Sequence, residues 1–198
     1  MEGPTWLDGE GLLFSDVPNG GVYKLSEGGD VTTVVPHRRG IGGLAVHAAG
    51  GLVVGGRNVA YKGQAKEGTH VLLPQDCVPD IVGFNDLTTD EAGRIYVGSL
   101  GASPFSPEAE RSTGHLHLID LDGTSRVLAS GIKLTNGLGF SPDGSLLYHS
   151  DSRAHLVGVY AVRADGTLGP RQPFAPVEPG VPDGLAVAED GSVWVAVA

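Results

Sequence analysis

The chain is poor in several features, and each shortage excludes a class of protein. Cys77 is the only cysteine among 198 residues, which excludes an internal disulfide and favours a reducing compartment. No apolar run approaches the ~20 residues that a membrane helix needs. The first residues have neither the basic nor the apolar region of a secretory signal. We therefore expect a cytoplasmic protein without a membrane partner.

Positive charge is also scarce. Lysine and arginine number 13 against 23 aspartates and glutamates, so the formal net charge is −10. Arg38 and Arg39 form the only adjacent basic pair, which is too short for a basic patch. Because nucleic acids are bound through clustered basic side chains, no nucleic-acid partner is expected.

Glycine and proline are abundant by contrast. The chain has 32 glycines and 13 prolines beside 40% apolar residues, which is typical of a folded protein dense in turns. No stretch keeps a helical period. Asp-Gly pairs between β-type runs predict tight hairpins, as at Asp143-Gly144 and Asp190-Gly191. These features indicate an all-β fold.

Five strand openings repeat along the chain at intervals of 40, 43, 51 and 47 residues. A period in the forties with frequent turns is typical of the blades of a β-propeller, whereas a solenoid has a shorter and stricter repeat. The openings are Gly3-Pro4-Thr5-Trp6, Gly43-Leu44-Ala45-Val46, Asp86-Leu87-Thr88-Thr89, Gly137-Leu138-Gly139-Phe140 and Gly184-Leu185-Ala186-Val187.

The residue just before each opening is the informative one. Four of these five positions carry a side-chain oxygen, and the residues in order are Glu2, Gly42, Asn85, Asn136 and Asp183. Equivalent positions of repeats around an axis converge, and converging oxygens are the ligands of a hard metal ion. All-oxygen ligation favours calcium, magnesium or manganese over zinc.

Two of these positions have a plainer interpretation. Asn136-Gly137 and Asp183-Gly184 are also ordinary turn dipeptides. However, the hairpin turns of those repeats are already assigned to the Asp-Gly pairs seven residues further on. We therefore favour ligands at both positions.

The chain is short for a closed ring of such blades. The fifth opening is followed by an inner hairpin at most, so we expect residues 1–198 to form a single, incomplete propeller domain of about four to five blades. Either the chain is a fragment or a partner completes it. The uncharged run Ser192–Ala198 would be a free edge, so we expect instability or self-association, and an oligomer through open blade edges stays an alternative.

Several motifs together carry a family resemblance over essentially the whole chain. The motifs are Glu2-Gly3-Pro4-Thr5-Trp6, Phe84-Asn85-Asp86-Leu87-Thr88-Thr89-Asp90, Thr135-Asn136-Gly137-Leu138, Ser141-Pro142-Asp143-Gly144 and Pro182-Asp183-Gly184-Leu185-Ala186. In this order they resemble the gluconolactonase, regucalcin (senescence marker protein) and luciferin-regenerating enzyme family. The resemblance implies a six-bladed propeller that holds one divalent cation in its central channel and hydrolyses lactones.

The resemblance also assigns roles to residues. By matching motifs, it implies that Glu2, Asn136 and Asp183 bind the metal and that Asn85 binds substrate. It implies calcium as the cation, with magnesium, manganese or zinc as alternatives. The cation would polarise a lactone carbonyl, while Asp183 would act as the catalytic carboxylate on the attacking water.

Two departures from the family matter for function. Sugar-lactone members often carry a substrate-binding arginine two residues before the asparagine that matches Asn85, and here that position is Gly83. Family members also run on for about a further blade and a half, and often begin about a strand earlier. A metal-dependent lactonase or esterase acting on a small molecule is therefore the expectation. The alternative is a non-catalytic calcium-binding or scaffold propeller.

Other candidate residues receive structural interpretations. His115 and His117 share one face of a strand but match an outer position of the repeat, and His149 is expected to pack. Cys77 has no base nearby in the sequence, and no serine stands in a nucleophile-elbow context. The Pro-containing run 103–110 is either a mobile loop near the channel mouth or a plain surface connection.

Overall fold

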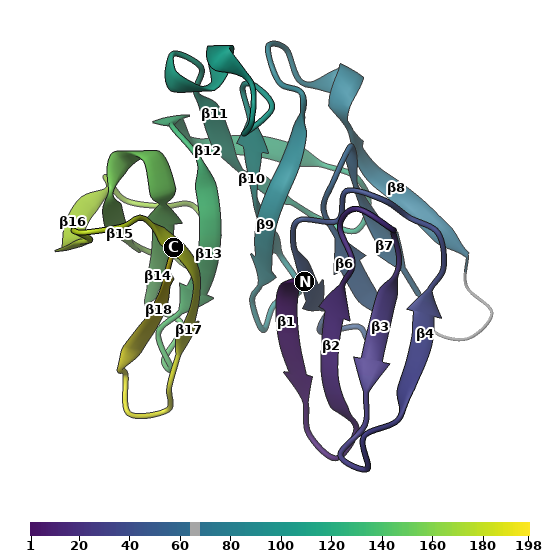
Figure 1. Ribbon diagram of the computed structural model, residues 1–198. Coiled ribbons are helices and arrows are strands. Elements are labelled where there is room, and N and C mark those ends of the chain that lie inside the picture. The colour runs from purple at the N-terminus through teal and green to yellow at the C-terminus, as the bar shows by residue number, and fades with distance from the viewer. Residues whose placement is uncertain (64–67) are drawn as a thin grey trace.

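Strands dominate the computed structural model, which describes residues 1–63 and 68–198 (Figure 1). The helices of these residues are three short 3-10 turns, namely η1 (Gln75–Cys77), η2 (Pro107–Glu110) and η3 (Ser152–Ala154). None of the helices in the described ranges is long and apolar enough to cross a membrane. The predicted all-β class is thus confirmed.

The strands form four four-stranded antiparallel sheets and one two-stranded sheet, each made from consecutive strands. Blade 1 contains β1 (Glu2–Leu7), β2 (Gly11–Ser15), β3 (Val22–Leu25) and β4 (Val31–Val35). Blade 2 contains β5 (Leu44–Val46), β6 (Leu52–Val54), β7 (Asn58–Lys62) and β8 (Thr69–Pro74). Blade 3 contains β9 (Gly83–Thr89), β10 (Ile95–Leu100), β11 (Gly114–Ile119) and β12 (Ser125–Ile132). Blade 4 contains β13 (Thr135–Phe140), β14 (Leu146–Asp151), β15 (Leu156–Ala161) and β16 (Gln172–Pro176), and the fifth sheet contains β17 (Pro182–Val187) and β18 (Val193–Val197).

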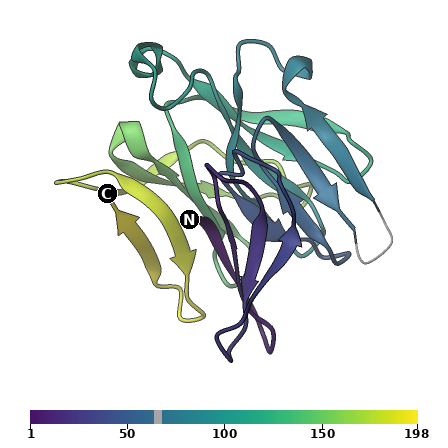
Figure 2. The same cartoon turned by 45° about the vertical axis from the view of Figure 1, so that its right-hand side comes forward.

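The sheets follow one another as the blades of a propeller. The first strand of each sheet contacts the first strand of the next, in the order β1, β5, β9, β13 and β17. Blade 1 and the fifth sheet therefore stand at the two ends of an arc (Figures 1 and 2). The expected incomplete propeller of about four to five blades is confirmed as four full blades and one hairpin.

Apolar cores fill the spaces between neighbouring blades. Leu13 and Val22 of blade 1 pack with Leu44 and Val54 of blade 2, and similar clusters join blades 2 and 3 and blades 3 and 4. The alternation of buried and less buried residues along β2 directs one face of the sheet into this core. Each fully buried Leu or Val contributes roughly 1.5–3 kcal/mol, so the blades stabilise one another.

The Asp-Gly hairpins form where the sequence predicts them. Gly144 and Gly191 have φ values of +69° and +85°, which the turns between β13 and β14 and between β17 and β18 require. Asp143 accepts hydrogen bonds from Ser141 Oγ at 2.6 Å and from Ser145 N at 3.0 Å. These bonds lower the pKa of the Asp143 carboxyl to about 2.

The fifth sheet leaves large apolar side chains exposed. Trp194 is 71% exposed and Val197 is 56% exposed on β18. Instability or self-association through this edge stays a prediction, as does the assignment of residues 1–198 to a single domain.

Candidate metal and substrate site

A repeated strand irregularity positions the predicted site residues. The pairing of the first two strands shifts register between Glu2 and Thr5 in blade 1 and between Thr135 and Leu138 in blade 4. The same shift stands between Pro182 and Leu185 in the fifth sheet and at the start of β9 in blade 3. Such bulges redirect side chains, and they are frequent beside active sites.

The second repeat differs from the others at this position. Its residue is Gly42, which lies outside β5, and β5 pairs with β6 without a register shift. A Cβ at Gly42 would collide with Oδ1 of Asn85. The missing side chain in blade 2 therefore leaves the space that the Asn85 carbonyl oxygen occupies.

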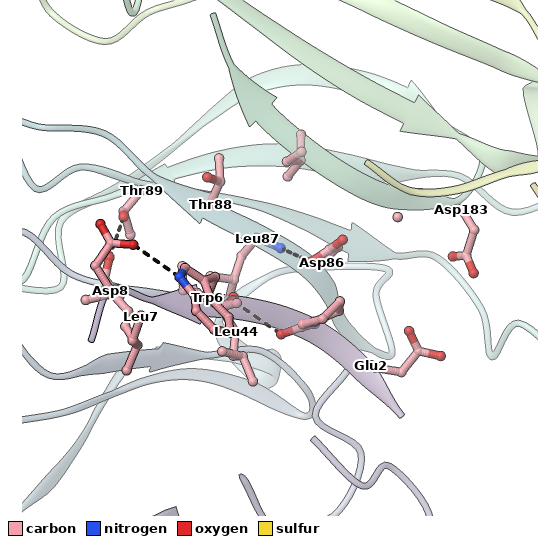
Figure 3. Close-up of a pocket in the computed structure, with 17 residues that line it drawn as sticks. Glu2, Trp6, Leu7, Asp8, Leu44, Asp86, Leu87, Thr88, Thr89 and Asp183 are labelled. Carbon is pink, nitrogen blue, oxygen red and sulfur yellow. Dashed lines mark hydrogen bonds between the residues drawn. The ribbon is translucent and has the colours of Figure 1, made fainter. Parts of the chain in front are cut away.

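The structure brings three carboxylates together along one cavity of about 520 Å³. Glu2 and Asp183 were predicted as site residues, and Asp86 joins them in the cavity wall. Figure 3 shows the carboxylates of Glu2 and Asp183 pointing toward one another, with Asp86 beside them. Burial raises the pKa of Glu2, and the charge of Asp183 raises it further.

Asp86 is the site residue that the motif analysis missed. Burial raises its pKa to about 7, and the charges of Glu2 and Asp183 act in the same direction, against a hydrogen bond from Leu87 N. The corresponding position of the other repeats is glycine, at Gly3, Gly43, Gly137 and Gly184. A carboxylate where four repeats have glycine is the sequence signal that would have identified it.

The neighbouring glycine makes room for this carboxylate. A Cβ at Gly43 would lie 2.5 Å from Asp86 Oδ1 and 2.6 Å from its Cα. Real Cβ atoms do not approach other atoms so closely, so blades 2 and 3 could not keep this contact with a larger residue at position 43.

The two predicted asparagines form a hydrogen-bonded pair. Asn85 Nδ2 donates to Asn136 Oδ1 at 2.9 Å and to the carbonyl oxygen of Thr135 at 2.7 Å. Asn136 Nδ2 donates to Ser152 Oγ at 2.7 Å. The amide nitrogens are thus engaged within the protein, and the Oδ1 of Asn136, which accepts from Asn85, keeps a second lone pair for a ligand. Neither asparagine is among the residues that line the cavity of the carboxylates.

This donor set fits a hard divalent cation. No group of three or more His, Cys, Asp or Glu side chains in the described residues would hold a metal by itself. The two predicted carboxylates and the two amide oxygens supply neutralising charge and further oxygens of the kind that calcium binds. The raised pKa values of Glu2 and Asp86 indicate crowded negative charge, which a cation would relieve.

The remaining candidates have structural roles. His117 is 2% exposed, its Nε2 lies 2.9 Å from Ser99 Oγ, and its ring lies 5.8 Å from that of His115. His149 is fully buried, with Nε2 3.1 Å from Thr135 Oγ1. Cys77 is exposed in η1.

The loop between β10 and β11 is tied to blade 4. The guanidinium of Arg153 donates to the carbonyl oxygens of Pro104 at 2.5 Å and Ala109 at 3.2 Å. Its Nε lies 3.6 Å from Glu110 Oε1. Whether residues 103–110 form a mobile loop or a plain surface connection stays open, and these bonds attach them to blade 4.

Comparisons with known proteins identify the family and the fold of the chain. Residues 1–198 match the family described as SMP-30/Gluconolactonase/LRE-like region. The chain is 32% identical over 206 residues to the 6-deoxy-6-sulfogluconolactonase of Pseudomonas putida, with 98% of this chain and 67% of the relative covered.

Solved structures of other proteins share the fold of this chain. A gluconolactonase from Xanthomonas campestris superposes with a TM-score of 0.82 at 26% identity, covering 99% of this chain and 69% of that one. The calcium-binding protein regucalcin from Agrobacterium tumefaciens has the same fold, with a TM-score of 0.79 at 20% identity and coverage of 99% and 66%. The chain thus spans about two thirds of the length of these relatives.

Proposed function

Because the chain belongs to the SMP-30/gluconolactonase/LRE-like family, we propose that it is a divalent-metal-dependent hydrolase that opens a lactone. Glu2, Asn136 and Asp183 hold the cation, and Asn85 binds the substrate. The single observation that carries this proposal is the gathering of oxygens at the repeated bulge, with Glu2, Asp86 and Asp183 around one cavity. Mutual repulsion of this kind is costly, and a scaffold alone has no use for it.

Calcium is the cation that the donor chemistry and the regucalcin relative favour, with magnesium and manganese as alternatives. When bound, the cation supplies Lewis acidity toward the lactone carbonyl and neutralises negative charge that develops on its oxygen. Glu2 and Asp183 together carry two negative charges, which balance one divalent ion.

The side chains of the protein perform the remaining tasks. Asp183 lines the cavity and, through a carboxylate oxygen, orients a water molecule and accepts its proton. Asn85 has engaged its amide nitrogen with Thr135 and Asn136, so its Oδ1 accepts a hydrogen bond from a substrate hydroxyl. Asp86 adds a carboxylate that is easily protonated, since its pKa is about 7.

Gly83 restricts the class of lactone. Its φ is +158°, and a Cβ there would lie 3.0 Å from the Gly56 carbonyl oxygen. The backbone therefore disfavours the arginine that sugar-lactone members carry at this position. We propose a lactone or ester that does not depend on this contact.

A non-catalytic calcium-binding propeller is the second candidate, and the absent arginine at Gly83 favours it. Assays of a panel of lactones with calcium, manganese or EDTA distinguish the two. Hydrolysis that EDTA abolishes and calcium restores supports the lactonase. Tight calcium binding without turnover of any lactone would favour the second candidate.

The proposal also covers the kind of substrate, the domain organisation and the cellular compartment. The substrate is a small molecule, and residues 1–198 act as one propeller domain. The single exposed Cys77 suits a reducing, cytoplasmic compartment.

A further inference from the structure

One hydroxyl of blade 4 joins two of the proposed ligand positions. Ser152 lies in η3, directly after β14, and is 3% exposed. Its Oγ donates to the carbonyl oxygen of Pro182 at 2.5 Å and accepts from Asn136 Nδ2 at 2.7 Å. Pro182 is the residue directly before Asp183. A single side chain thus contacts the amide of one position and the backbone that leads into the next.

The bond to Pro182 belongs to a repeated pattern. The carbonyl oxygen just before each of the last four repeat positions accepts a hydrogen bond from the preceding blade. The four pairs are Ser15 Oγ to Ile41 at 2.8 Å, Gly56 N to Phe84 at 3.0 Å, Asn85 Nδ2 to Thr135 at 2.7 Å, and Ser152 Oγ to Pro182. Ser15 also lies 3.1 Å from the backbone carbonyl oxygen of Glu2, the repeat position of its own blade, whereas Ser152 contacts the side-chain amide of Asn136.

This second contact fixes the orientation of Asn136. Its Oδ1 accepts from Asn85 Nδ2 at 2.9 Å, while its Nδ2 donates to Ser152. A flipped amide would place Nδ2 against the amide hydrogens of Asn85, so both ends of the amide are determined. The carbonyl oxygen of Asn136 therefore keeps one position, and its second lone pair can bind a cation.

We propose that Ser152 is a positioning residue of the cation site, which acts through Asn136. This inference rests on the proposed metal-dependent function. Ser152 orders the Asn136 amide for its ligand role, and its own bond to the Pro182 carbonyl oxygen fixes the Ser152 hydroxyl for this contact. Groups that orient a ligand contribute to metal affinity although they do not touch the ion.

The chain offers a matched control two residues away. Ser150 is also fully buried on β14, but its Oγ has no hydrogen-bond partner in the described structure. Ser150→Ala removes the same atom as Ser152→Ala from the same part of blade 4. Unlike Ser152→Ala, Ser150→Ala breaks no hydrogen bond to a site residue.

Calcium titration calorimetry of the chain tests the proposal. Ser152→Ala should weaken calcium binding by roughly tenfold or more, whereas Ser150→Ala should leave the affinity within about twofold of wild type. Melting without calcium reports folding separately. If Ser152→Ala does not fold, Ser152→Cys keeps the volume but is a weak hydrogen-bond partner, and it should also lose affinity.

A double-mutant cycle separates positioning from a merely structural role. If Ser152 acts through Asn136, the Ser152→Ala change should cost little further affinity in an Asn136→Ala background. Additive losses would overturn the proposal, as would unchanged affinity in Ser152→Ala. A wild-type chain that binds no calcium would instead refute the proposed function, and this inference with it.

Discussion

Two buried histidines should make the fold sensitive to mild acid. Burial and, to a lesser extent, the charge of His115 lower the pKa of His117 from 6.5 to about 4. Burial likewise lowers the pKa of His149 to about 4, where Asp151 raises it and Arg171 lowers it. The Nδ1 atom of His149 has no partner in the described structure, so a proton there would be a buried, unpaired donor.

The sign and the size follow from proton linkage. Between pH 4 and pH 6.5 these two histidines are protonated in the unfolded state but not in the folded state. The free energy of unfolding therefore falls as the pH falls through this window. Acidification from pH 6.5 to about pH 5 covers roughly 1.5 pH units, so each histidine lowers the free energy of unfolding by about 2 kcal/mol. In a domain of this size, 2 kcal/mol lowers the melting temperature by about 4–8 °C.

Urea unfolding of wild type and His117→Gln at several pH values between about 7 and 5 measures the effect. Asp86 titrates in the same window with the opposite sign, because its pKa is raised to about 7. The test is therefore the difference between variant and wild type in how the free energy of unfolding changes with pH. The variant should lose about 2 kcal/mol less on acidification, while the exposed His70→Gln should match wild type. Parallel curves for wild type and His117→Gln would refute the reasoning.

Three further changes probe the site and its surroundings. Asp183→Ala should abolish calcium binding and lactone hydrolysis while circular dichroism shows an intact fold; unchanged turnover would remove the proposed mechanism. Gly42→Ala should displace Asn85 and lower kcat/KM on the order of tenfold or more, whereas Gly28→Ala, where a Cβ would lie 3.7 Å from Ser26 Oγ, should be neutral. Arg153→Ala should speed limited proteolysis of the loop between β10 and β11, and an unchanged cleavage rate would show that its bonds do not hold this loop.

The sequence predicts the blades well because they are repeated, and the same repetition is what selects the candidate oxygen ligands. Each blade opening recurs at a similar interval. Asn136 and Asp183 are therefore recognised as equivalent positions, although each with its following glycine would alone predict only a turn. The bulges of the inner strands are less accessible to sequence reasoning. They depend on the pairing register of two strands, which the sequence of one strand does not specify.

Single departures from the repeat are harder to predict. Asp86 replaces a glycine in one blade only, and its raised pKa arises from burial and from Glu2 and Asp183, which are distant in sequence. The contacts of Ser152 are hidden for the same reason. Its partners Asn136 and Pro182 are brought together by the packing of blade 4 against the fifth sheet.

Calcium titration of the chain tests the central claim most directly, namely that oxygens at the repeated bulge hold a divalent cation. The account predicts a single binding site per chain that is lost in Glu2→Gln and in Asp183→Ala. Calcium binding that survives both substitutions, or no binding by the wild-type chain, would contradict it.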